Sequence, residues 1–209
     1  MRAGFFILEG CEAVGKTTQL KRLEAALREQ GHDIVVTREP GGTVIGERIR
    51  AILLDREHAA AIQPFTSSLL FNASRRQWVH EVVRPALDAG KIVLADRSFL
   101  STMVYQSYVE GEDPVFTKEV CLKAMEGTMP DTIFLLDISL KEMKQRLVAN
   151  AGEKTTRYDV KEEAFHAKVR EGYLAQIDLF PGLIEKIDGE VPVEEVSGAI
   201  LGKILKSVS

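Results

Sequence analysis

Short apolar runs alternate with longer amphipathic stretches along the chain. Continuous apolar runs bounded by polar residues are typical of strands buried on both faces of a parallel sheet. Five such runs are present, at Phe5–Leu8, Ile34–Val36, Ile92–Ala95, Ile133–Leu136 and Leu183–Ile187. Apolar residues at helical spacing predict a helix from near Lys16 up to Gly31 and further helices at 43–56, 65–89, 114–126, 139–150, 161–179 and 193–207. The alternation predicts an α/β fold, a five-stranded parallel sheet with helices on both faces.

Length and composition fit one globular domain. The 209 residues show no repeat and no linker, so we expect a single domain over 1–209. With 45% hydrophobic and 28% charged residues, the chain is able to bury a sizeable core. A net charge of −4 gives no electrostatic footprint for nucleic acid, and we expect no nucleic-acid partner.

The N-terminus and the two cysteines bear on the cellular setting. The first apolar segment is too short for a membrane span and has no signal-peptide cleavage site, so we expect a cytoplasmic protein with no membrane partner. Cys11 and Cys121 form no C-x-x-C pair and no zinc-ligand cluster. We therefore expect two reduced thiols.

The first apolar run leads directly into a phosphate-binding motif. Residues 10–17 read GCEAVGKT and match G-x-x-x-x-G-K-[ST]. Glycines at both ends let successive backbone N–H groups point into one concavity, and the following helix adds its positive N-terminal end. Lys16 would reach the β- and γ-phosphates, and the Thr17 hydroxyl would coordinate Mg²⁺, which prefers oxygen ligands. The motif predicts a nucleoside triphosphate site in a P-loop NTPase fold.

A second chemical feature follows the third apolar run. Ligands of parallel sheets bind beyond the carboxyl ends of the strands, where this chain places Asp96 and Arg97. Asp96 stands where a Walker-B-type carboxylate would hold Mg²⁺, directly or through water. The Arg97 guanidinium could clamp a phosphate in bidentate fashion and neutralise charge during its transfer. We expect the ends of the first three strands to face one crevice.

At this point the sequence resembles the thymidylate kinase family, whose members phosphorylate dTMP with ATP, and the likeness runs through nearly the whole chain. The matching segments, in order and spacing, are Phe6–Gly10, Gly15–Gln19, Thr37–Thr43, Asp96-Arg97 and Tyr105-Gln106. The conjunction of these segments is more specific than any one motif. The resemblance implies an ATP site formed by Gly10, Cys11, Glu12, Ala13, Val14, Gly15, Lys16, Thr17 and Thr18.

The resemblance also implies how the acceptor base would be read. Phe71 would stack on thymine, and Arg75, one helical turn further on, would donate to the thymine carbonyl at position 4. Thr102 and Gln106 match positions that touch the base edge. Tyr105 matches the residue that crowds the sugar where a ribonucleotide carries its 2′-hydroxyl, so selectivity for deoxyribose is implied.

The remaining acceptor contacts implied by the resemblance are charged. Arg38, Arg50 and Arg97 are the candidates to hold the monophosphate. Glu12 matches an acidic position that contacts the acceptor sugar or the metal site. The family also implies a homodimer, formed through long apolar helices.

A polar stretch late in the chain matches the family's lid over ATP, at about 149–160. Family members differ in whether a catalytic arginine lies in the phosphate loop or in this lid. The phosphate loop here offers Ala13 and Val14, so Arg157 is the expected catalytic arginine, alongside Lys16 and Arg97. The resemblance is therefore to the lid-arginine type.

Two departures from the family pattern leave an alternative open. Ser98 stands where the family usually has an aromatic residue or histidine, and Ala13 stands near a usual glycine. Ser98 makes the segment look somewhat like a deoxynucleoside kinase, which phosphorylates a 5′-hydroxyl and needs a carboxylate base; Glu12 could be that base. The segment Arg38–Thr43 favours the monophosphate kinase.

Two non-enzymatic alternatives find less support. A GTPase-like switch would share the phosphate loop, but the sequence has no N-K-x-D guanine-reading motif. An inactive nucleotide-binding scaffold is not favoured, because Lys16, Thr17, Asp96 and Arg97 are all present.

Overall fold

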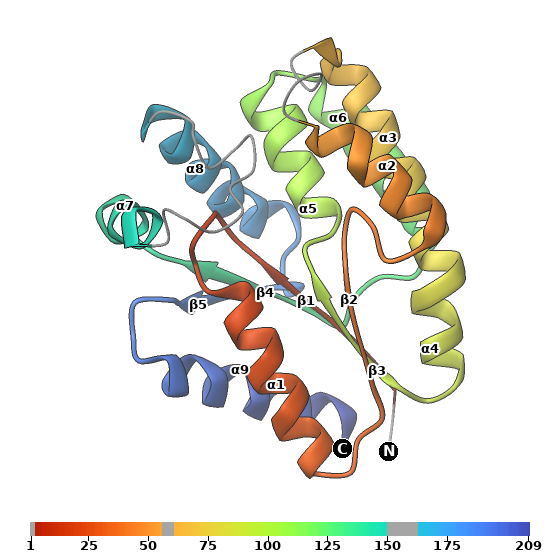
Figure 1. Cartoon of the computed structure of the whole chain (residues 1–209), viewed down its shortest axis with the longest axis vertical. Coiled ribbons are helices and arrows are strands. Elements are labelled where there is room, and N and C mark those ends of the chain that lie inside the picture. Colours follow the sequence, from red (N-terminus) through yellow and green to blue (C-terminus); the bar gives the residue numbers. More distant parts are fainter. Residues whose placement is uncertain (1–2, 56–60, 150–162) are drawn as a thin grey trace.

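The fold is a parallel sheet between two layers of helices (Figure 1). The computed structural model describes residues 3–55, 61–149 and 163–209. The sheet has the strand order β2-β3-β1-β4-β5, and every neighbouring pair is parallel. The strands are β1 (Gly4–Glu9), β2 (Ile34–Arg38), β3 (Ile92–Asp96), β4 (Thr132–Asp137) and β5 (Ile184–Asp188). The predicted α/β class, strand number and strand direction are confirmed.

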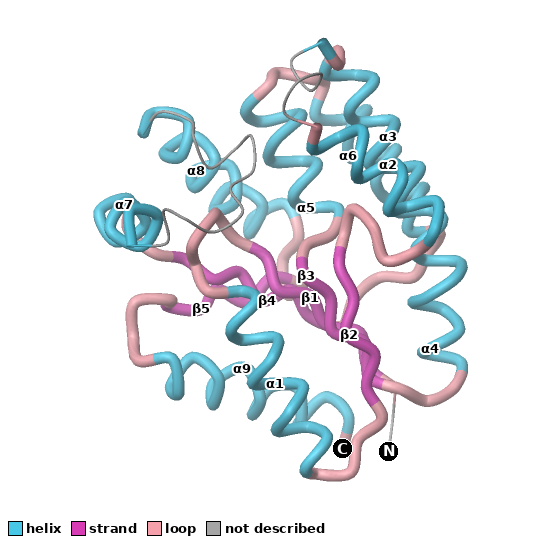
Figure 2. The backbone as a smooth tube through the Cα atoms, viewed as in Figure 1, coloured by secondary structure: helices cyan, strands magenta, loops and turns pink. Residues whose placement is uncertain are grey.

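Helices cover both faces of this sheet. Figures 1 and 2 show α1 and α9 side by side on one face, and α4 and α8 on the opposite face. The helices of the described residues are α1 (Lys16–Glu29), α2 (Val44–Leu54), α3 (Pro64–Trp78), η2 (Val79–Val83), α4 (Arg84–Asp88), α5 (Phe99–Thr102), η3 (Met103–Val109), α6 (Pro114–Met125), α7 (Leu140–Ala149), α8 (Glu163–Leu179) and α9 (Val193–Val208). The labels η2 and η3 denote π-helical segments, and η2 joins α3 and α4 into the continuous helical stretch expected at 65–89.

The helical segment at 99–109 is absent from the sequence prediction. It comprises α5 and η3, and most of its residues are buried around the whole helix circumference. A helix buried on every side has no polar face, so its sequence lacks the 3.6-residue periodicity that identifies amphipathic helices. Its eleven residues also form wider π-type turns over the last seven, which further obscures the pattern.

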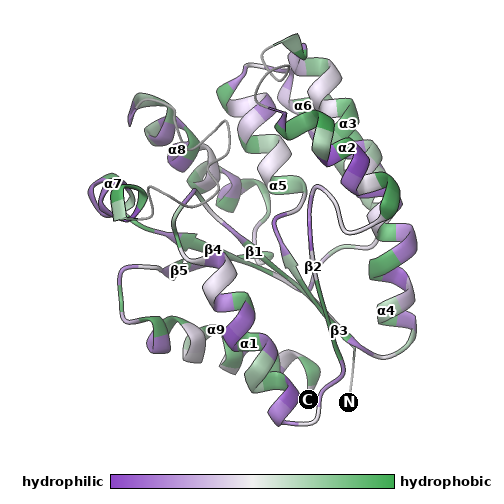
Figure 3. Ribbon diagram, viewed as in Figure 1, coloured by the Kyte–Doolittle hydropathy of each residue, from purple (hydrophilic) through white to green (hydrophobic). Residues whose placement is uncertain are grey.

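The register of the sheet brings the functional strand ends level with one another. Leu8 of β1 and Arg38 of β2 both pair with Asp96 of β3, so the residues that follow these strands leave the sheet at one edge. The core strands are fully buried, with Phe6 and Leu94 at 0% exposure, and Figure 3 colours them predominantly as hydrophobic. Burial of the strands thus holds the three strand ends in a fixed relation.

A glycine permits close packing of α8 on η3. A Cβ atom added at Gly172 would lie 2.9 Å from Cδ1 of Tyr108 and 3.0 Å from Cγ1 of Val104. Real Cβ atoms essentially never approach a neighbouring atom under 3.0 Å, so the spacing between the two helices depends on the missing side chain.

No helix in the described parts of the chain has both the length and the apolarity to cross a membrane.

Candidate active site

One crevice opens at the carboxyl ends of β1, β2 and β3. It collects residues that are distant in sequence, from the phosphate loop to η3. The residues that line it are Glu12, Arg38, Glu39, Pro40, Arg50, Leu54, Phe71, Arg75, Asp96, Arg97, Ser98, Ser101, Thr102, Tyr105 and Gln106. Every residue proposed from the sequence to contact the acceptor is among them. The expectation that three strand ends face one crevice is confirmed.

The phosphate loop turns on residues with positive φ. Gly10 (φ 133°) and Gly15 (φ 95°) adopt backbone conformations that favour glycine. A Cβ at Gly10 would also collide with the carbonyl oxygen of Leu136, so this position has no room for a side chain. Ala13 adopts φ 57°, a left-handed backbone conformation that is uncommon for residues other than glycine.

Lys16 lies over the loop that it belongs to. Its ammonium group donates to the carbonyl oxygens of Gly10 at 2.9 Å and Cys11 at 2.7 Å. Burial lowers the pKa of Lys16, and the nearby charge of Arg97 acts in the same direction. Thr17 and Thr18 follow at the start of α1 with exposed side chains, as a metal or phosphate contact requires.

The two cysteines are free and buried, in agreement with the expectation of reduced thiols. Burial raises the pKa of the Cys11 thiol to about 12, and Glu12 adds to the effect. Burial likewise raises the pKa of Cys121, although the charge of Arg75 opposes it. Both groups are therefore neutral thiols at physiological pH.

Glu12 and Arg97 form the centre of the crevice. One oxygen of Glu12 accepts from Nη2 of Arg97 at 3.1 Å and from the Tyr105 hydroxyl at 2.7 Å. Burial acts to raise the pKa of Glu12, but the charges of Arg97 and Lys16 outweigh it and hold this pKa below its ordinary value. The Arg97 guanidinium also lies over the Tyr105 ring, 5.7 Å from its centroid.

The backbone of Arg97 is held in an unusual conformation. Its φ is 67°, in the left-handed region, and its N–H donates to the Leu8 carbonyl at 3.0 Å. Left-handed backbone at a residue other than glycine is uncommon and costs about 1–3 kcal/mol. This turn directs the side chain into the crevice, where 21% of its surface remains exposed.

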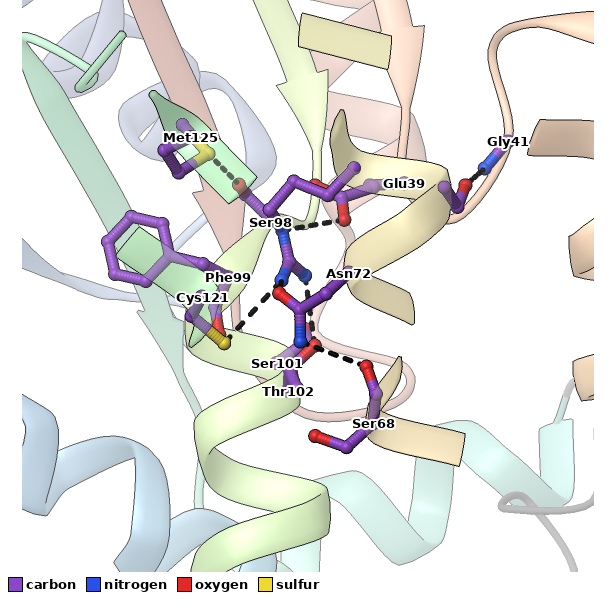
Figure 4. Close-up of polar contacts among 12 residues, drawn as sticks. Glu39, Gly41, Ser68, Asn72, Ser98, Phe99, Ser101, Thr102, Cys121 and Met125 are labelled. Atoms are coloured by element: carbon purple, nitrogen blue, oxygen red, sulfur yellow. Dashed lines mark hydrogen bonds and ion pairs between the residues drawn. The ribbon is translucent and has the colours of Figure 1, made fainter. Parts of the chain in front are cut away.

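Arg75 forms a second charged centre, on α3. Its Nε lies 2.8 Å from a carboxylate oxygen of Glu39, and both side chains are at most 2% exposed. Its Nη1 donates to the Asn72 side-chain oxygen at 2.5 Å and contacts the Cys121 sulfur at 3.5 Å, and its Nη2 donates to the Thr102 hydroxyl at 2.9 Å. Figure 4 shows four of these partners, Glu39, Asn72, Thr102 and Cys121, close together although they come from different elements of the fold.

Burial has the largest effect on the pKa of Glu39, the carboxylate paired with Arg75. It raises the pKa of Glu39 to about 7, although the adjacent Arg75 charge acts to lower it. Glu39 follows β2 and precedes a cis peptide bond to Pro40. The residue therefore lies where β2 leaves the sheet and meets α3.

The other predicted acceptor residues occupy the rim and the floor. Arg38 pairs with Glu47 at 2.9 Å on the exposed rim, and Arg50 donates to the Pro40 carbonyl at 2.8 Å. Phe71 is half-buried one helical turn before Arg75. Gln106 is 1% exposed.

The Nε2 atom of Gln106 has no hydrogen-bond partner among the described residues. The floor thus carries a buried amide donor that a ligand could satisfy.

Oxygen atoms at the strand ends fit a magnesium ion. Oδ1 of Asp96 and Oε2 of Glu12 are buried and have no hydrogen-bond partner within the described parts of the chain. No group of three or more His, Cys, Asp or Glu side chains suited to a metal occurs among those residues. The two buried carboxylate oxygens suit Mg²⁺, which is commonly bound through one or two carboxylates together with substrate phosphates and waters.

The expected lid lies almost wholly outside the described residues. Of the stretch 149–160, only Ala149 at the end of α7 is described, and Arg157 is not. The role expected for Arg157 therefore stays a prediction.

Sequence reasoning missed four residues that organise the site: Glu9, Glu39, Ser101 and Tyr173. Glu9 ends β1 and is 0% exposed, and burial raises its pKa against the opposing charge of Arg97. A carboxylate closing a wholly apolar strand was a usable signal for Glu9. Tyr173 lies on α8, far from the motifs in sequence, and only the fold brings it to the site.

Comparisons with known proteins agree with one another. The family model described as thymidylate kinase matches residues 8–200. A thymidylate kinase of Geotalea uraniireducens is 42% identical over 205 residues, covering 96% of each chain. A thymidylate kinase of Caldanaerobacter subterraneus subsp. tengcongensis is 43% identical over 90% of this chain and 88% of its own. A thymidylate kinase of a Geobacillus species is 38% identical over 100% of this chain and 99% of its own.

Proposed function

The chain belongs to the thymidylate kinase family, and on that premise we propose how its crevice carries out the reaction. The enzyme transfers the γ-phosphate of ATP to dTMP and so forms dTDP and ADP. The observation that best supports the assignment of roles is that all the expected acceptor residues line one crevice beside the phosphate loop. The roles below follow from the positions of these residues.

The acceptor base occupies the side of the crevice formed by α3, α5 and η3. Phe71 offers its ring as a stacking surface, and Arg75 donates to the base at the carbonyl of position 4. Thr102 and Gln106 meet the base edge, where the Gln106 amide N–H, which has no partner among the residues that the structure describes, is available. These contacts read a pyrimidine by its carbonyls and ring nitrogen.

The sugar and monophosphate occupy the side nearer the phosphate loop. Tyr105, held against Glu12 by a 2.7 Å hydrogen bond, fills the space where a ribonucleotide would need room for its 2′-hydroxyl. Arg97 holds the monophosphate, with Arg38 and Arg50 approaching from the rim. Glu12 orients Arg97 and faces the sugar or the metal site.

The reaction needs alignment and positive charge more than a base. A phosphate oxygen of dTMP is already a competent nucleophile, so the protein must mainly place it in line with the γ-phosphate and reduce their repulsion. Lys16 and Arg97 supply charge from the described residues, and Arg157 is proposed to supply it from the lid. Glu12 is a poor general base for a 5′-hydroxyl, because its pKa lies below the ordinary value and one oxygen is engaged by Arg97 and Tyr105.

Thr17 and Asp96 would hold Mg²⁺, with Glu12 close by. When bound, the ion would neutralise part of the charge of the ATP phosphates. The groups that support this assignment are the exposed Thr17 hydroxyl and the Asp96 oxygen, which has no hydrogen-bond partner in the described parts of the chain.

A coupled assay of ADP formation with ATP and Mg²⁺ tests the proposal. Its arms compare dTMP, dUMP, ribo-TMP and thymidine as acceptors. We expect dTMP to give the highest kcat/KM and ribo-TMP to be rejected. Use of thymidine without dTMP would contradict the assignment and make Glu12 a general base; equal use of ribo-TMP would contradict the role of Tyr105 alone.

We also propose a homodimer formed through α2, α3 and α6. These helices expose large apolar side chains on adjoining elements, at Val44, Ile45, Ile52, Phe65, Leu69, Val115 and Phe116. The rings of Phe65 and Phe116 lie 5.5 Å apart across α3 and α6. Exposed apolar side chains gathered in this way are typical of protein interfaces.

Sedimentation measures the assembly directly. We expect a dimer in the unmodified protein and a monomer in the Leu69→Glu variant. The matched control is Val148→Glu on α7, which is 70% exposed and outside this surface. A monomeric unmodified protein would contradict the proposal.

A further inference from the structure

The hydroxyl of Tyr173 is a buried junction between three parts of the site. It accepts from Nη1 of Arg97 at 2.8 Å, donates to Oε2 of Glu9 at 3.0 Å, and lies 2.9 Å from the Ser101 hydroxyl. Tyr173 comes from α8, Ser101 from α5 and Glu9 from β1. The side chain of Tyr173 is 1% exposed and does not line the crevice, so it has no direct access to a nucleotide.

Glu9 anchors this junction and does not itself bind a ligand. One of its oxygens accepts from the backbone N–H groups of Ser98 at 2.7 Å and Ser101 at 3.3 Å. The other accepts from the hydroxyls of Ser101 at 2.8 Å and Tyr173 at 3.0 Å. A carboxylate has about four acceptor positions, so Glu9 has none left for a metal.

The junction fixes the direction of the Arg97 guanidinium. Nη1 is held by Tyr173 and by the Ser101 hydroxyl at 3.2 Å, while Nη2 is held by Glu12 at 3.1 Å. Glu12 alone attracts the guanidinium but leaves it free to turn about that contact. Contacts on both Nη atoms define the plane of the group, which bidentate binding of a phosphate requires.

We propose that Tyr173 is a positioning residue that sets the Arg97 guanidinium for the acceptor phosphate, acting from α8 through a hydroxyl anchored on Glu9. This inference rests on the proposed role of Arg97 in holding the monophosphate. It adds a residue that touches neither nucleotide and lies on a helix that contributes nothing to the crevice lining.

The test removes the hydroxyl and keeps the ring. In Tyr173→Phe, we expect kcat/KM for dTMP to fall about tenfold, the scale of one hydrogen bond to a charged group. We expect the KM for ATP to change by less than about twofold, because the Tyr173 hydroxyl contacts Arg97, Ser101 and Glu9, which lie outside the phosphate loop. The control Tyr108→Phe, which alters a 40% exposed tyrosine packed against the neighbouring Gly172, leaves both constants unchanged.

A double-mutant cycle separates positioning from a general structural effect. Calorimetric dTMP binding without ATP is measured for the unmodified protein, Tyr173→Phe, Arg97→Ala and the double variant. We expect Tyr173→Phe to weaken binding in the first background and to change it by less than about twofold when Arg97 is already absent. Equal weakening in both backgrounds would overturn the inference.

The outcomes also separate this inference from the proposed function. If Arg97→Ala binds dTMP as tightly as the unmodified protein, the role proposed for Arg97 is wrong. If Arg97→Ala is impaired and Tyr173→Phe is not, the role of Arg97 stands and the inference is wrong. Should Tyr173→Phe fail to fold, Ser101→Ala removes the other hydroxyl that contacts Nη1, and the same non-additive result is expected.

Discussion

The two sides of the crevice each contain an arginine paired with a buried glutamate, yet they are built differently. On the base side, Arg75 pairs with Glu39 and both are at most 2% exposed. On the phosphate side, Arg97 pairs with Glu12, keeps 21% of its side chain exposed, and shares its surroundings with further ionisable groups.

The difference lies in what remains available to a ligand. The Arg75 guanidinium already contacts partners on several elements and locks them together. The phosphate side has oxygens on Glu12 and Asp96 that lack a hydrogen-bond partner within residues 3–55, 61–149 and 163–209, and a lysine folded onto its own loop. A pocket for a rigid base benefits from fixed walls, whereas a phosphoryl-transfer site must exchange its internal partners for those of its substrates.

The largest expected effect is a loss of activity when the phosphate side is altered. Lys16→Met removes the ammonium group proposed to reach the transferred phosphate, and we expect kcat to fall at least ~10³-fold. Steady-state assays of ADP formation measure this loss. The control is Lys21→Met, on an exposed position of the same helix, for which we expect no loss of activity. A fall of similar size in the control would contradict the argument.

Removing the buried arginine of the base side is expected to lower the stability of the fold. Arg75→Ala leaves the Glu39 carboxyl buried without its partner, and we expect the free energy of unfolding to drop by about 3–5 kcal/mol. Urea denaturation followed by circular dichroism measures the drop. The neighbouring Arg76→Ala removes a 42% exposed ion pair with Glu126 and is expected to cost less than about 1 kcal/mol. Comparable losses in both variants would mean that burial of the pair is unimportant.

A pH series sharpens the contrast further. The pKa of Glu39 is raised to about 7 in the folded protein, so the folded state keeps a proton that the unfolded state releases above its ordinary pKa near 4.5. The free energy of unfolding should therefore decline as the pH rises from about 4.5 to 7, by roughly 3 kcal/mol from this group.

Glu39→Gln should remove this component of the decline, and the exposed Glu119→Gln should keep it. Denaturation midpoints at several pH values give the comparison. Identical pH profiles for the unmodified protein and Glu39→Gln would show that Glu39 does not titrate in this range.

The smallest expected effect concerns one thiol on each side. Cys11 and Cys121 are buried and their pKa values are raised, so neither should react with a thiol reagent in the folded protein at pH 8. We expect two thiols to become reactive on unfolding in urea. Rapid labelling of one thiol before unfolding would identify the side of the crevice that opens.

The sequence predicted the sheet and the crevice well because both depend on local patterns. Buried strands appear as apolar runs, and a parallel sheet places their carboxyl ends at one edge. Asp96 and Arg97 were therefore expected beside the phosphate loop. The segment 99–109 was missed because a helix buried on all sides has no periodic polar face. Tyr173 was missed for a different reason: its contacts with Glu9 and Arg97 span 164 and 76 residues, and no local signal marks them.

The partnerships within the site were also beyond sequence reasoning. Nothing in the segment around Glu39 shows that its carboxylate will meet Arg75, since the contact depends on how β2 and α3 pack. The same holds for Arg38, which pairs with Glu47 at the rim. Motifs indicate which residue types gather, and tertiary packing decides which of them pair.

Gly172 lies outside the active site but controls the distance between α8 and η3, which affects the site. Because a methyl group there would press on Tyr108 and Val104, the gap between α8 and η3 is as narrow as backbone and rings allow. Tyr173 is the next residue on α8, so any widening of that gap would carry its hydroxyl away from Arg97. The missing Cβ of Gly172 thus sets where the Tyr173 hydroxyl lies, and through it the orientation of the Arg97 guanidinium.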